Sequence, residues 1–293
     1  MISVTCAALA AALLNSGSAG KHFVLKEDCG PANGSWALTV KPYFNPPVTI
    51  DAGNHIVHGI NVATGGGLRW RGGTIVAPEG PYPQARPHGY GVRIWAGTRD
   101  ISFDRTTFTN ARKAIVTHQT RNISVTNSRF HGRLEDGLIA SETNGIVFSH
   151  NKAGPFDIIY PKCALPNGSV LERLPRRDCE PRGGVWTDGW HADVLQIRNA
   201  TTDVVAEYNE IDTPGQGLAN MDAKTDLPVA RVRFSHNRIK AVTHWLTLGP
   251  CEDCQIDHNV IEKNGRWRAV IHPGTARACG NKSADGGPGL DPC

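Results

Sequence analysis

The densest group of chemically capable side chains lies in residues 188–198, the segment DGWHADVLQIR. These side chains are an imidazole, a carboxylate, an amide and a guanidinium, on His191, Asp193, Gln196 and Arg198. A positioned base can remove a proton from a substrate, and cationic or amide donors can stabilise the anion that forms. The segment therefore predicts a site for acid–base chemistry.

Polar residues recur at equivalent points of neighbouring segments. If Leu195 points inward, the alternation of a strand turns Gln196 and Arg198 outward. An alignment of the segments then predicts an inward column of Ile94, Val116, Ile139, Leu195, Ala219 and Leu246. It also predicts two columns on the outer surface. The first contains Trp95, Thr117, Ala140, Gln196, Asn220 and Thr247, and the second contains Gly97, Gln119, Glu142, Arg198, Asp222, Gly249 and His272. A shift of one residue would exchange the two faces.

β-Elimination at a uronic acid requires removal of the C5 proton and neutralisation of the sugar carboxylate. Lys224 or His191 is a candidate base. The catalytic candidates together are His191, Asp193, Asp222, Lys224 and Arg198. The substrate-binding candidates are Gln196, Asn220, Gln119 and His272, with Trp95 and Trp245 as surfaces on which sugar rings can stack.

Three carboxylates of this group, on Glu142, Asp193 and Asp222, suit a hard cation. Because Ca²⁺ prefers oxygen ligands, these residues are also a candidate calcium site. Other chemistry stays open: Asp193 and Asp222 could be the acid and the base or nucleophile of a glycoside hydrolase. A C5 epimerase and a glycan-binding protein without catalysis are further alternatives.

The columns depend on a repeat in the chain. Each repeated segment contains a short alternating strand, and the segments are residues 100–108, 122–130, 145–153, 203–211, 230–239 and 254–261. Phe103, Val125 and Phe148 lie 22 and 23 residues apart within them. Short strands at a period of about 20–25 residues are typical of a solenoid whose coils bury each other's apolar faces. We therefore predict an all-β chain wound as a single-stranded parallel β-helix.

Asparagine ends each of four repeats, at Asn151, Asn209, Asn237 and Asn259, with Ser128 and Thr106 at the equivalent earlier positions. Asparagine tolerates the left-handed backbone of tight turns, and a stacked column of its side chains can bond from coil to coil. The column is interpreted as structural.

Three segments depart from the repeat within one predicted domain, residues 1–293. Residues 5–16 predict a capping helix with Thr5 as its N-cap. Residues 157–187 are an inserted loop, which we place over the binding face because solenoid insertions gather there. Residues 275–293 predict a C-terminal loop. The expected disulfides are Cys6–Cys29, Cys163–Cys179, Cys251–Cys254 and a staple of the tail between Cys279 and Cys293.

From Thr5 to about Gly274, the sequence resembles the pectate-lyase-like superfamily of right-handed parallel β-helices. The resemblance rests on the N-terminal cap, the asparagine-punctuated coils and phrases such as DGLIASETNGIVFSHN at 136–151. It implies right-handed winding and an enzyme that cleaves or modifies a polysaccharide, often an acidic one. We expect a polysaccharide lyase, with the alternatives above.

The composition narrows the possible partners and the cellular location of the protein. The 293 residues carry a net charge of +4, too mild for an obligate nucleic-acid binder, whose basic residues cluster. The basic balance slightly favours an acidic polysaccharide as partner. No stretch approaches the roughly 20 apolar residues of a membrane span. Eight cysteines, an even number, indicate a secreted or periplasmic protein. We expect a monomer without nucleic-acid or membrane partners.

Overall fold

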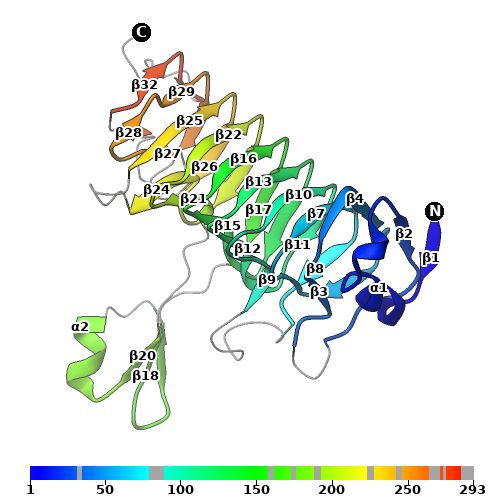
Figure 1. The fold of residues 1–293 in the computed structure, drawn as a ribbon. Helices are drawn as coiled ribbons and strands as arrows, with labels where there is room; N and C mark the ends of the chain where they lie inside the picture. The colour runs from blue at the N-terminus through cyan, green and yellow to red at the C-terminus, as the bar shows by residue number, and fades with distance from the viewer. Residues whose placement is uncertain are drawn as a thin grey trace.

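The computed structural model describes residues 1–31, 35–78, 89–157, 162–172, 176–187, 193–222, 228–241, 246–263, 271–272 and 275–284. Successive turns of the chain add strands to three long parallel sheets, the winding expected of a parallel β-helix (Figure 1). The N-terminus lies at one end of the stack and the C-terminus at the other (Figure 1).

Sheet A contains β1 (Ile2–Val4), β2 (His22–Leu25), β4 (Tyr43–Asp51), β7 (Gly66–Arg71), β10 (Arg99–Asp104), β13 (Arg121–Thr126), β16 (Asn144–Ser149), β22 (Thr202–Glu207), β25 (Val229–Ser235), β28 (Cys251–Glu252), β29 (Gln255–Asp257) and β32 (Arg277–Cys279). Sheet B contains β5 (Ile56–His58), β8 (Thr74–Val76), β11 (Thr107–Phe108), β14 (Arg129–Gly132), β17 (Lys152–Phe156), β23 (Glu210–Thr213), β26 (Arg238–Ala241), β30 (Val260–Lys263) and β33 (Lys282–Ser283). Sheet C contains β3 (Leu38–Val40), β6 (Ile60–Val62), β9 (Tyr90–Ile94), β12 (Ala111–His118), β15 (Leu134–Ser141), β21 (Asp193–Arg198), β24 (Leu218–Asp222), β27 (Leu246–Thr247) and β31 (Ile271–His272).

The core runs along the inside of the stack. Its largest fully buried side chains include Trp70, Phe103, Phe108, Phe130 and Phe148. The rings of Phe108 and Phe130 stack with their centroids 4.9 Å apart. Because each coil covers the apolar side chains of the next, the aromatic residues of the repeat form one continuous core.

The asparagine column forms a ladder inside the turns between sheets A and B. The side-chain oxygen of Asn209 accepts the backbone N–H of Asn151 at 3.0 Å, and that of Asn237 accepts the N–H of Asn209 at 3.0 Å. Asn259 and Asn281 continue the ladder by the same contact at 3.0 Å. The predicted structural role of the column is confirmed.

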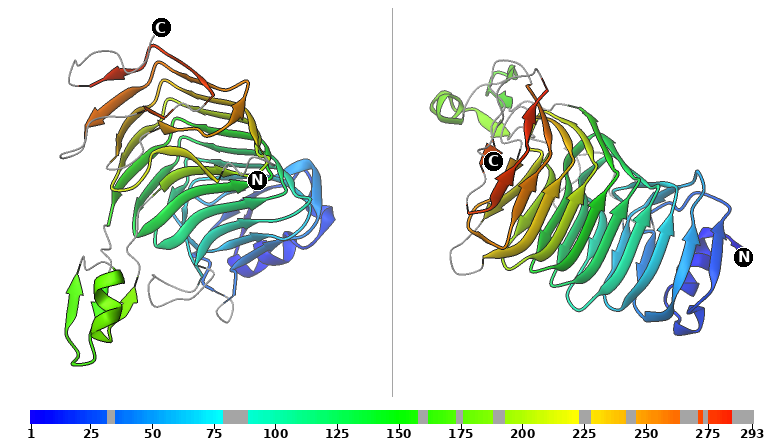
Figure 2. Two further views of the ribbon diagram at one scale, coloured as in Figure 1. Left: turned by 90° about the vertical axis from the view of Figure 1, so that its left-hand side faces the viewer. Right: turned by 90° about the horizontal axis from the view of Figure 1, so that it is seen from above.

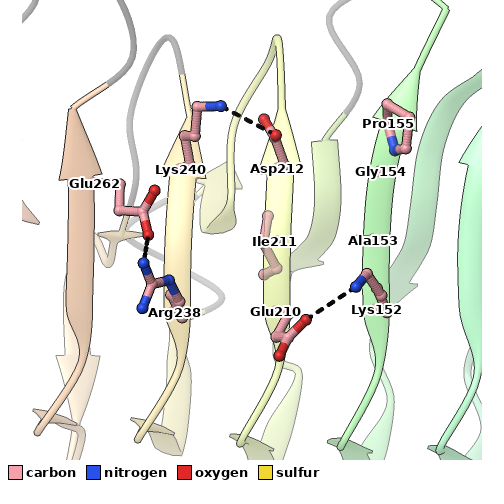
Figure 3. Close-up of a pocket in the computed structure, with 10 residues that line it drawn as sticks. All are labelled: Lys152, Ala153, Gly154, Pro155, Glu210, Ile211, Asp212, Arg238, Lys240 and Glu262. Atoms are coloured by element: carbon pink, nitrogen blue, oxygen red, sulfur yellow. Dashed lines mark hydrogen bonds and ion pairs between the residues drawn. The ribbon is translucent and has the colours of Figure 1, made fainter. Parts of the chain in front are cut away.

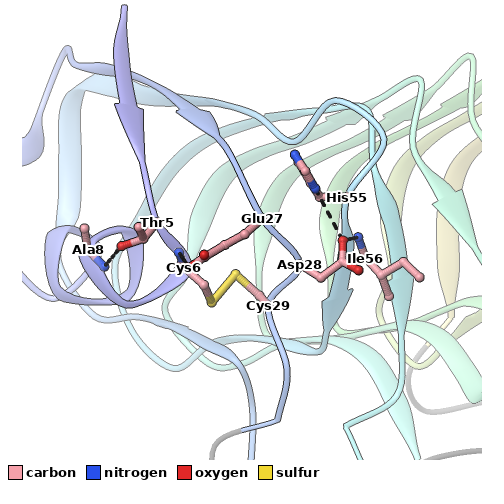
Figure 4. Close-up of a disulfide and its surroundings, with 8 residues drawn as sticks. All are labelled: Thr5, Cys6, Ala8, Glu27, Asp28, Cys29, His55 and Ile56. Carbon is pink, nitrogen blue, oxygen red and sulfur yellow. Dashed lines mark hydrogen bonds and ion pairs between the residues drawn. A yellow bond between two sulfur atoms is a disulfide. The ribbon is translucent and has the colours of Figure 1, made fainter.

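A short helix closes the N-terminal end, as predicted (Figure 4). Helix α1 (Cys6–Ala12) begins after Thr5, whose Oγ1 accepts the N–H of Ala8 at 3.3 Å. Leu9 points into the core. The Cys6–Cys29 disulfide fastens the helix to the first coil (Figure 4).

In the chain, the insertion lies between β17 of sheet B and β21 of sheet C, and its strands form a small sheet of their own. It contains β18 (Lys162–Ala164), β19 (Val170–Glu172), α2 (Arg176–Cys179), the 3₁₀ turn η2 (Glu180–Arg182) and β20 (Val185–Thr187), with β18 paired antiparallel to both other strands. The predicted Cys163–Cys179 disulfide joins β18 to α2. These elements stand to one side of the stacked coils in all views (Figures 1 and 2).

The C-terminal segment differs from its prediction as a loop. Its first residues form β32 and β33, which extend sheets A and B by one more turn. Asn281 explains the difference, because it supplies the next rung of the asparagine ladder. Cys279 is disulfide-bonded, whereas Cys293 lies outside the described residues.

The structure forms three of the predicted disulfides, including Cys251–Cys254. Disulfides persist in oxidising compartments, so they fit an extracellular protein. In the part of the chain that the structure describes, no helix is long and apolar enough to cross a membrane.

Candidate functional site

The alternation of sheet C is interrupted near the start of its strands. Ala114 and Ile115 are consecutive in β12, yet both side chains belong to the buried core. Val194 and Leu195 are likewise consecutive and buried in β21. Two successive inward residues reverse the alternation on either side of them. Residues 113 and 116 therefore lie on the same outer surface, as do the equivalent residues 193 and 196.

This reversal brings three charged residues into one row. Lys113 pairs with Asp136 across β12 and β15, and Asp136 pairs with Asp193 across β15 and β21. Neighbouring strands lie about 4.8 Å apart. The two aspartates are therefore adjacent in space although an insertion separates them in the sequence.

Asp136 is a buried carboxyl group with two unequal oxygens. Lys113 Nζ donates to its Oδ2 at 2.7 Å. Its Oδ1 is buried and accepts no hydrogen bond from the described residues. Burial raises the pKa of Asp136 to about 6, against the lowering effect of Lys113 and with a further rise from the charge of Asp193.

Asp193 has a more polar environment. Its Oδ1 accepts the backbone N–H of Gln216 at 2.9 Å, and its Oδ2 accepts a hydrogen bond from Gln196. The two aspartates therefore differ in their hydrogen-bond donors, although both are almost completely buried.

Gln196 connects the aspartate row to the other end of the strand. Its Oε1 accepts a hydrogen bond from Arg198 Nη2 at 2.8 Å. The side chains of Asp193, Gln196 and Arg198 thus form a continuous chain across the outer surface of β21. This part of the predicted site is brought together by the structure.

A second group lies where β9, β12 and β15 end. The Trp95 side chain is 38% exposed, and the Arg93 guanidinium lies 4.5 Å from its ring centroid. The His118 ring lies 5.0 Å from Trp95, and its Nδ1 is 3.9 Å from Glu142 Oε1. Gln119 donates to Glu142 at 2.8 Å, so the predicted neighbourhood of these two residues is confirmed.

The remaining candidates cannot be placed as side chains. His191, Lys224 and Trp245 lie outside the described residues. Asn220 and Asp222 belong to β24 and His272 belongs to β31, but only the strand positions of these three are described. Their assigned roles stay predictions.

The predicted register of sheet C was wrong by one residue at β9 and at β21. Ile94 pairs with Thr117 rather than with Val116. Ile139 pairs with Gln196 rather than with Leu195. Thr117 and Ala140, expected outside, are buried and in register with Ile197. The physical reason is that Ile139 is apolar but lies outside the core, so the pattern did not distinguish it from the inward Leu138, which pairs with Leu195.

The same error affected two other expectations. Ile115, Leu138, Val194 and Leu218, taken as outer apolar neighbours, belong to the core. His118, interpreted as a core histidine, lies beside Trp95 with its side chain 30% exposed.

The proposed calcium ligands do not come together. Asp193 is the first residue of β21, whereas Asp222 pairs with Arg198 at its last. The length of β21, roughly 15 Å of extended chain, separates these two positions. Glu142 follows Ser141, which also pairs with Arg198. These residues do not fit one ion, and no group of three potential ligands exists among the described residues. Asp193 and Asp222 lie at opposite ends of β21, so the structure does not pair them across adjacent positions.

The sequence reasoning missed Asp136 and Lys113. A signal for them existed, because Lys113 and Asp136 are one repeat apart, 23 residues. Asp193 follows at the equivalent position of the next coil, once the insertion is subtracted. Counting the repeat backwards from Asp193 would have found both residues.

No protein-family model matches the chain, and no curated protein sequence does. Two solved structures are similar to it. A GH136 lacto-N-biosidase from Eubacterium ramulus has a TM-score of 0.44 and 9% identity, over 96% of this chain and 67% of that chain. An alginate lyase from Paenibacillus sp. str. FPU-7 has a TM-score of 0.42 and 13% identity, over 98% of this chain and 96% of that chain. Similarities this distant do not assign an activity.

Proposed function

We propose that this protein is a secreted polysaccharide-degrading enzyme that cleaves glycosidic bonds with the carboxyl pair Asp136 and Asp193. The supporting observation is the adjacency of the two aspartates in unlike environments. Pairs of carboxyl groups whose surroundings push their pKa values apart are suited to opposite acid and base roles.

In hydrolysis, Asp136 is the acid. With a pKa of about 6, it keeps a proton in a useful fraction of molecules near neutral pH. It gives that proton to the glycosidic oxygen while the bond from this oxygen to the anomeric carbon breaks. The Oδ1 of Asp136 is buried and accepts no hydrogen bond from the described residues, so it is the oxygen proposed to carry the transferred proton.

Asp193 is the partner of this acid. Adjacent strands hold the backbones of the two aspartates about 4.8 Å apart, and a retaining mechanism requires their carboxyl groups to lie roughly 5–5.5 Å apart. Asp193 then attacks the anomeric carbon to form a glycosyl ester. Asp136, now ionised, takes a proton from the water that hydrolyses the ester. We expect the product to keep its anomeric configuration.

β-Elimination of an acidic glycan is the second candidate. It is favoured by the cations beside the carboxyl pair, Lys113 at 2.7 Å from Asp136 and Arg198 at the end of the Gln196 chain. Arg198 would neutralise a uronate carboxylate, and a basic residue would remove the C5 proton. With elimination we also propose a relationship to the pectate-lyase-like superfamily, whose coils wind in the right-handed sense.

Polysaccharide digestion tests both reactions. The protein is incubated with neutral polysaccharides, pectate and alginate, and reducing ends and the absorbance of unsaturated products are followed together. New reducing ends without that absorbance support hydrolysis, and growth of the absorbance supports elimination. Epimerised uronate without cleavage, or binding without any reaction, contradicts the proposed cleavage.

Asp136→Asn is the decisive variant, because it keeps the shape of the side chain and removes the acid. Loss of a general acid lowers the rate by about 10²–10⁴-fold. Glu207→Gln, on the outer surface of sheet A, is the matched control and should keep full activity. Full activity of Asp136→Asn would move the site elsewhere.

A further inference from the structure

A second polar surface lies on sheet B, around the corner of the solenoid from the carboxyl pair. It is a groove of about 480 Å³ over β17, β23, β26 and β30 (Figure 3). Gly154 lets β17 approach the backbone of β23 closely at one edge of the groove. A Cβ at this position would lie 2.1 Å from the carbonyl oxygen of Asp212, so only glycine fits there.

The charges in the groove are balanced. Its six charged residues are three bases and three acids, Lys152, Arg238 and Lys240 with Glu210, Asp212 and Glu262. They are grouped by strand, since both acids of β23 lie beside both bases of β26 (Figure 3). A ligand crossing the strands would meet donors and acceptors in alternation, about 4.8 Å apart.

Ion pairs hold these side chains across the strands. Lys152 lies 3.3 Å from Glu210, Lys240 lies 3.2 Å from Asp212, and Arg238 contacts Glu262. The side chains of Lys152 and Glu210 are 64% and 67% exposed. Exposed pairs of this kind contribute little to stability, so a ligand can replace them at little cost.

These features select a class of ligand. A hydroxyl group both donates and accepts, and so can bond to a carboxylate and an ammonium group in turn. A polyanion would meet Glu210, Asp212 and Glu262, whereas an uncharged polyhydroxylated chain meets no repulsion. Pro155, which is exposed at the rim, adds an apolar surface for the C–H face of a sugar.

We propose that the groove on sheet B is a non-catalytic binding site for an uncharged sugar chain. This inference goes beyond the proposed reaction, because it concerns another sheet and needs no catalysis. In the sequence, part of the groove nevertheless lies next to a residue that contacts the carboxyl pair. Strand β23, which carries Glu210 and Asp212, leads into Gln216, whose N–H binds Asp193.

Calorimetric titration of the Asp136→Asn protein tests the groove separately from cleavage. The probes are cellohexaose, xylohexaose and mannohexaose as uncharged chains, and hexagalacturonate as the anionic chain. The groove variant combines Asp212→Ala with Lys240→Ala, which leaves the net charge unchanged. The control combines Glu207→Ala with Arg233→Ala, whose pair at 3.1 Å joins the same two coils on sheet A.

We expect at least one uncharged hexasaccharide to bind and the groove variant to weaken its binding at least tenfold. The control variant should change that affinity less than twofold. Hydrogen exchange in β23 and β26 should slow when the hexasaccharide binds. Equal affinities of the groove and control variants, binding of hexagalacturonate alone, or no binding of any probe would overturn the inference. A wild-type protein that cleaves no polysaccharide, together with a groove that still binds the hexasaccharide, would overturn only the proposed reaction.

Discussion

Lys113 Nζ lies 2.7 Å from Asp136 Oδ2, while Oδ1 of the same carboxyl group accepts no hydrogen bond from the described residues. One oxygen is thus held by a cation, and the other is the oxygen that can carry the proton of the acid. Lys113 lowers the pKa of Asp136, which burial raises to about 6. The lysine is therefore a positioning residue whose charge sets the pH range of the acid.

Replacement of Lys113 should move this pH range. In Lys113→Met the stabilising charge is lost, so the pKa of Asp136 rises above about 6. If Asp136 acts as the acid, activity falls as pH rises through that pKa, and the alkaline limb of kcat/KM should shift to higher pH. Lys26→Met, at an exposed position in the first coil, should leave the limb in place. An unchanged limb in Lys113→Met would remove Asp136 from the role of acid.

The raised pKa of Asp136 also makes stability depend on pH. The folded pKa of about 6 lies above the ordinary value of 3.8, so the folded state binds the proton more tightly. This contribution is fully present below pH 3.8 and is lost as pH rises through 6. A difference of about two units corresponds to roughly 3 kcal/mol. Urea denaturation between pH 4 and 7 should show this loss in the wild type relative to Asp136→Asn. Parallel curves for the two proteins would contradict it.

The asparagine ladder predicts a large loss of stability at Asn237. Its Oδ1 accepts from the backbone N–H of Asn209 at 3.0 Å, and its Nδ2 donates to the carbonyl of Ala206 at 2.9 Å. Asn237→Ala leaves these buried groups without partners, at about 1–3 kcal/mol for each. We expect the free energy of unfolding to fall by roughly 3 kcal/mol in urea denaturation. Asn144→Ala, at an exposed position in β16, should cost less than about 1 kcal/mol. Similar losses in both variants would contradict a special role of the ladder.

The folded structure of the insertion should depend on the Cys163–Cys179 disulfide more than the stability of the coils does. Cys163 and Cys179 are 16 residues apart, and closing a loop of this size stabilises by about 3 kcal/mol. Replacing both by serine should speed proteolysis within residues 162–187 while the thermal midpoint of the coils stays within a few degrees. Mass spectrometry of the fragments and calorimetry would show this. Cleavage outside the insertion, or a large fall in the midpoint, would indicate that the insertion supports the coils.

The periodic parts of the structure could be predicted from the sequence. The spacing of Phe103, Val125 and Phe148 reports the length of one coil, because each coil must bury the same apolar column. Asn209 and Asn237 mark turns for an equally local reason, since the side chain of one coil bonds to the backbone of the adjacent coil. The capping helix and the disulfides also follow from neighbouring residues or from pairs that the repeat brings close.

The candidate site was decided by the tertiary structure. The alignment of the repeats predicted that Ile139 would pair with Leu195, but Gln196 takes that position. The consecutive inward residues Val194 and Leu195 reverse the alternation of the strand. Nothing local in the sequence marks such a reversal, because apolar residues suit both faces equally well. The same reversal turns Asp193 outward beside Asp136, across an insertion that hides their equivalence. The sequence by itself thus determined the coil and its turns, and packing at the corner decided which side chains meet on its surface.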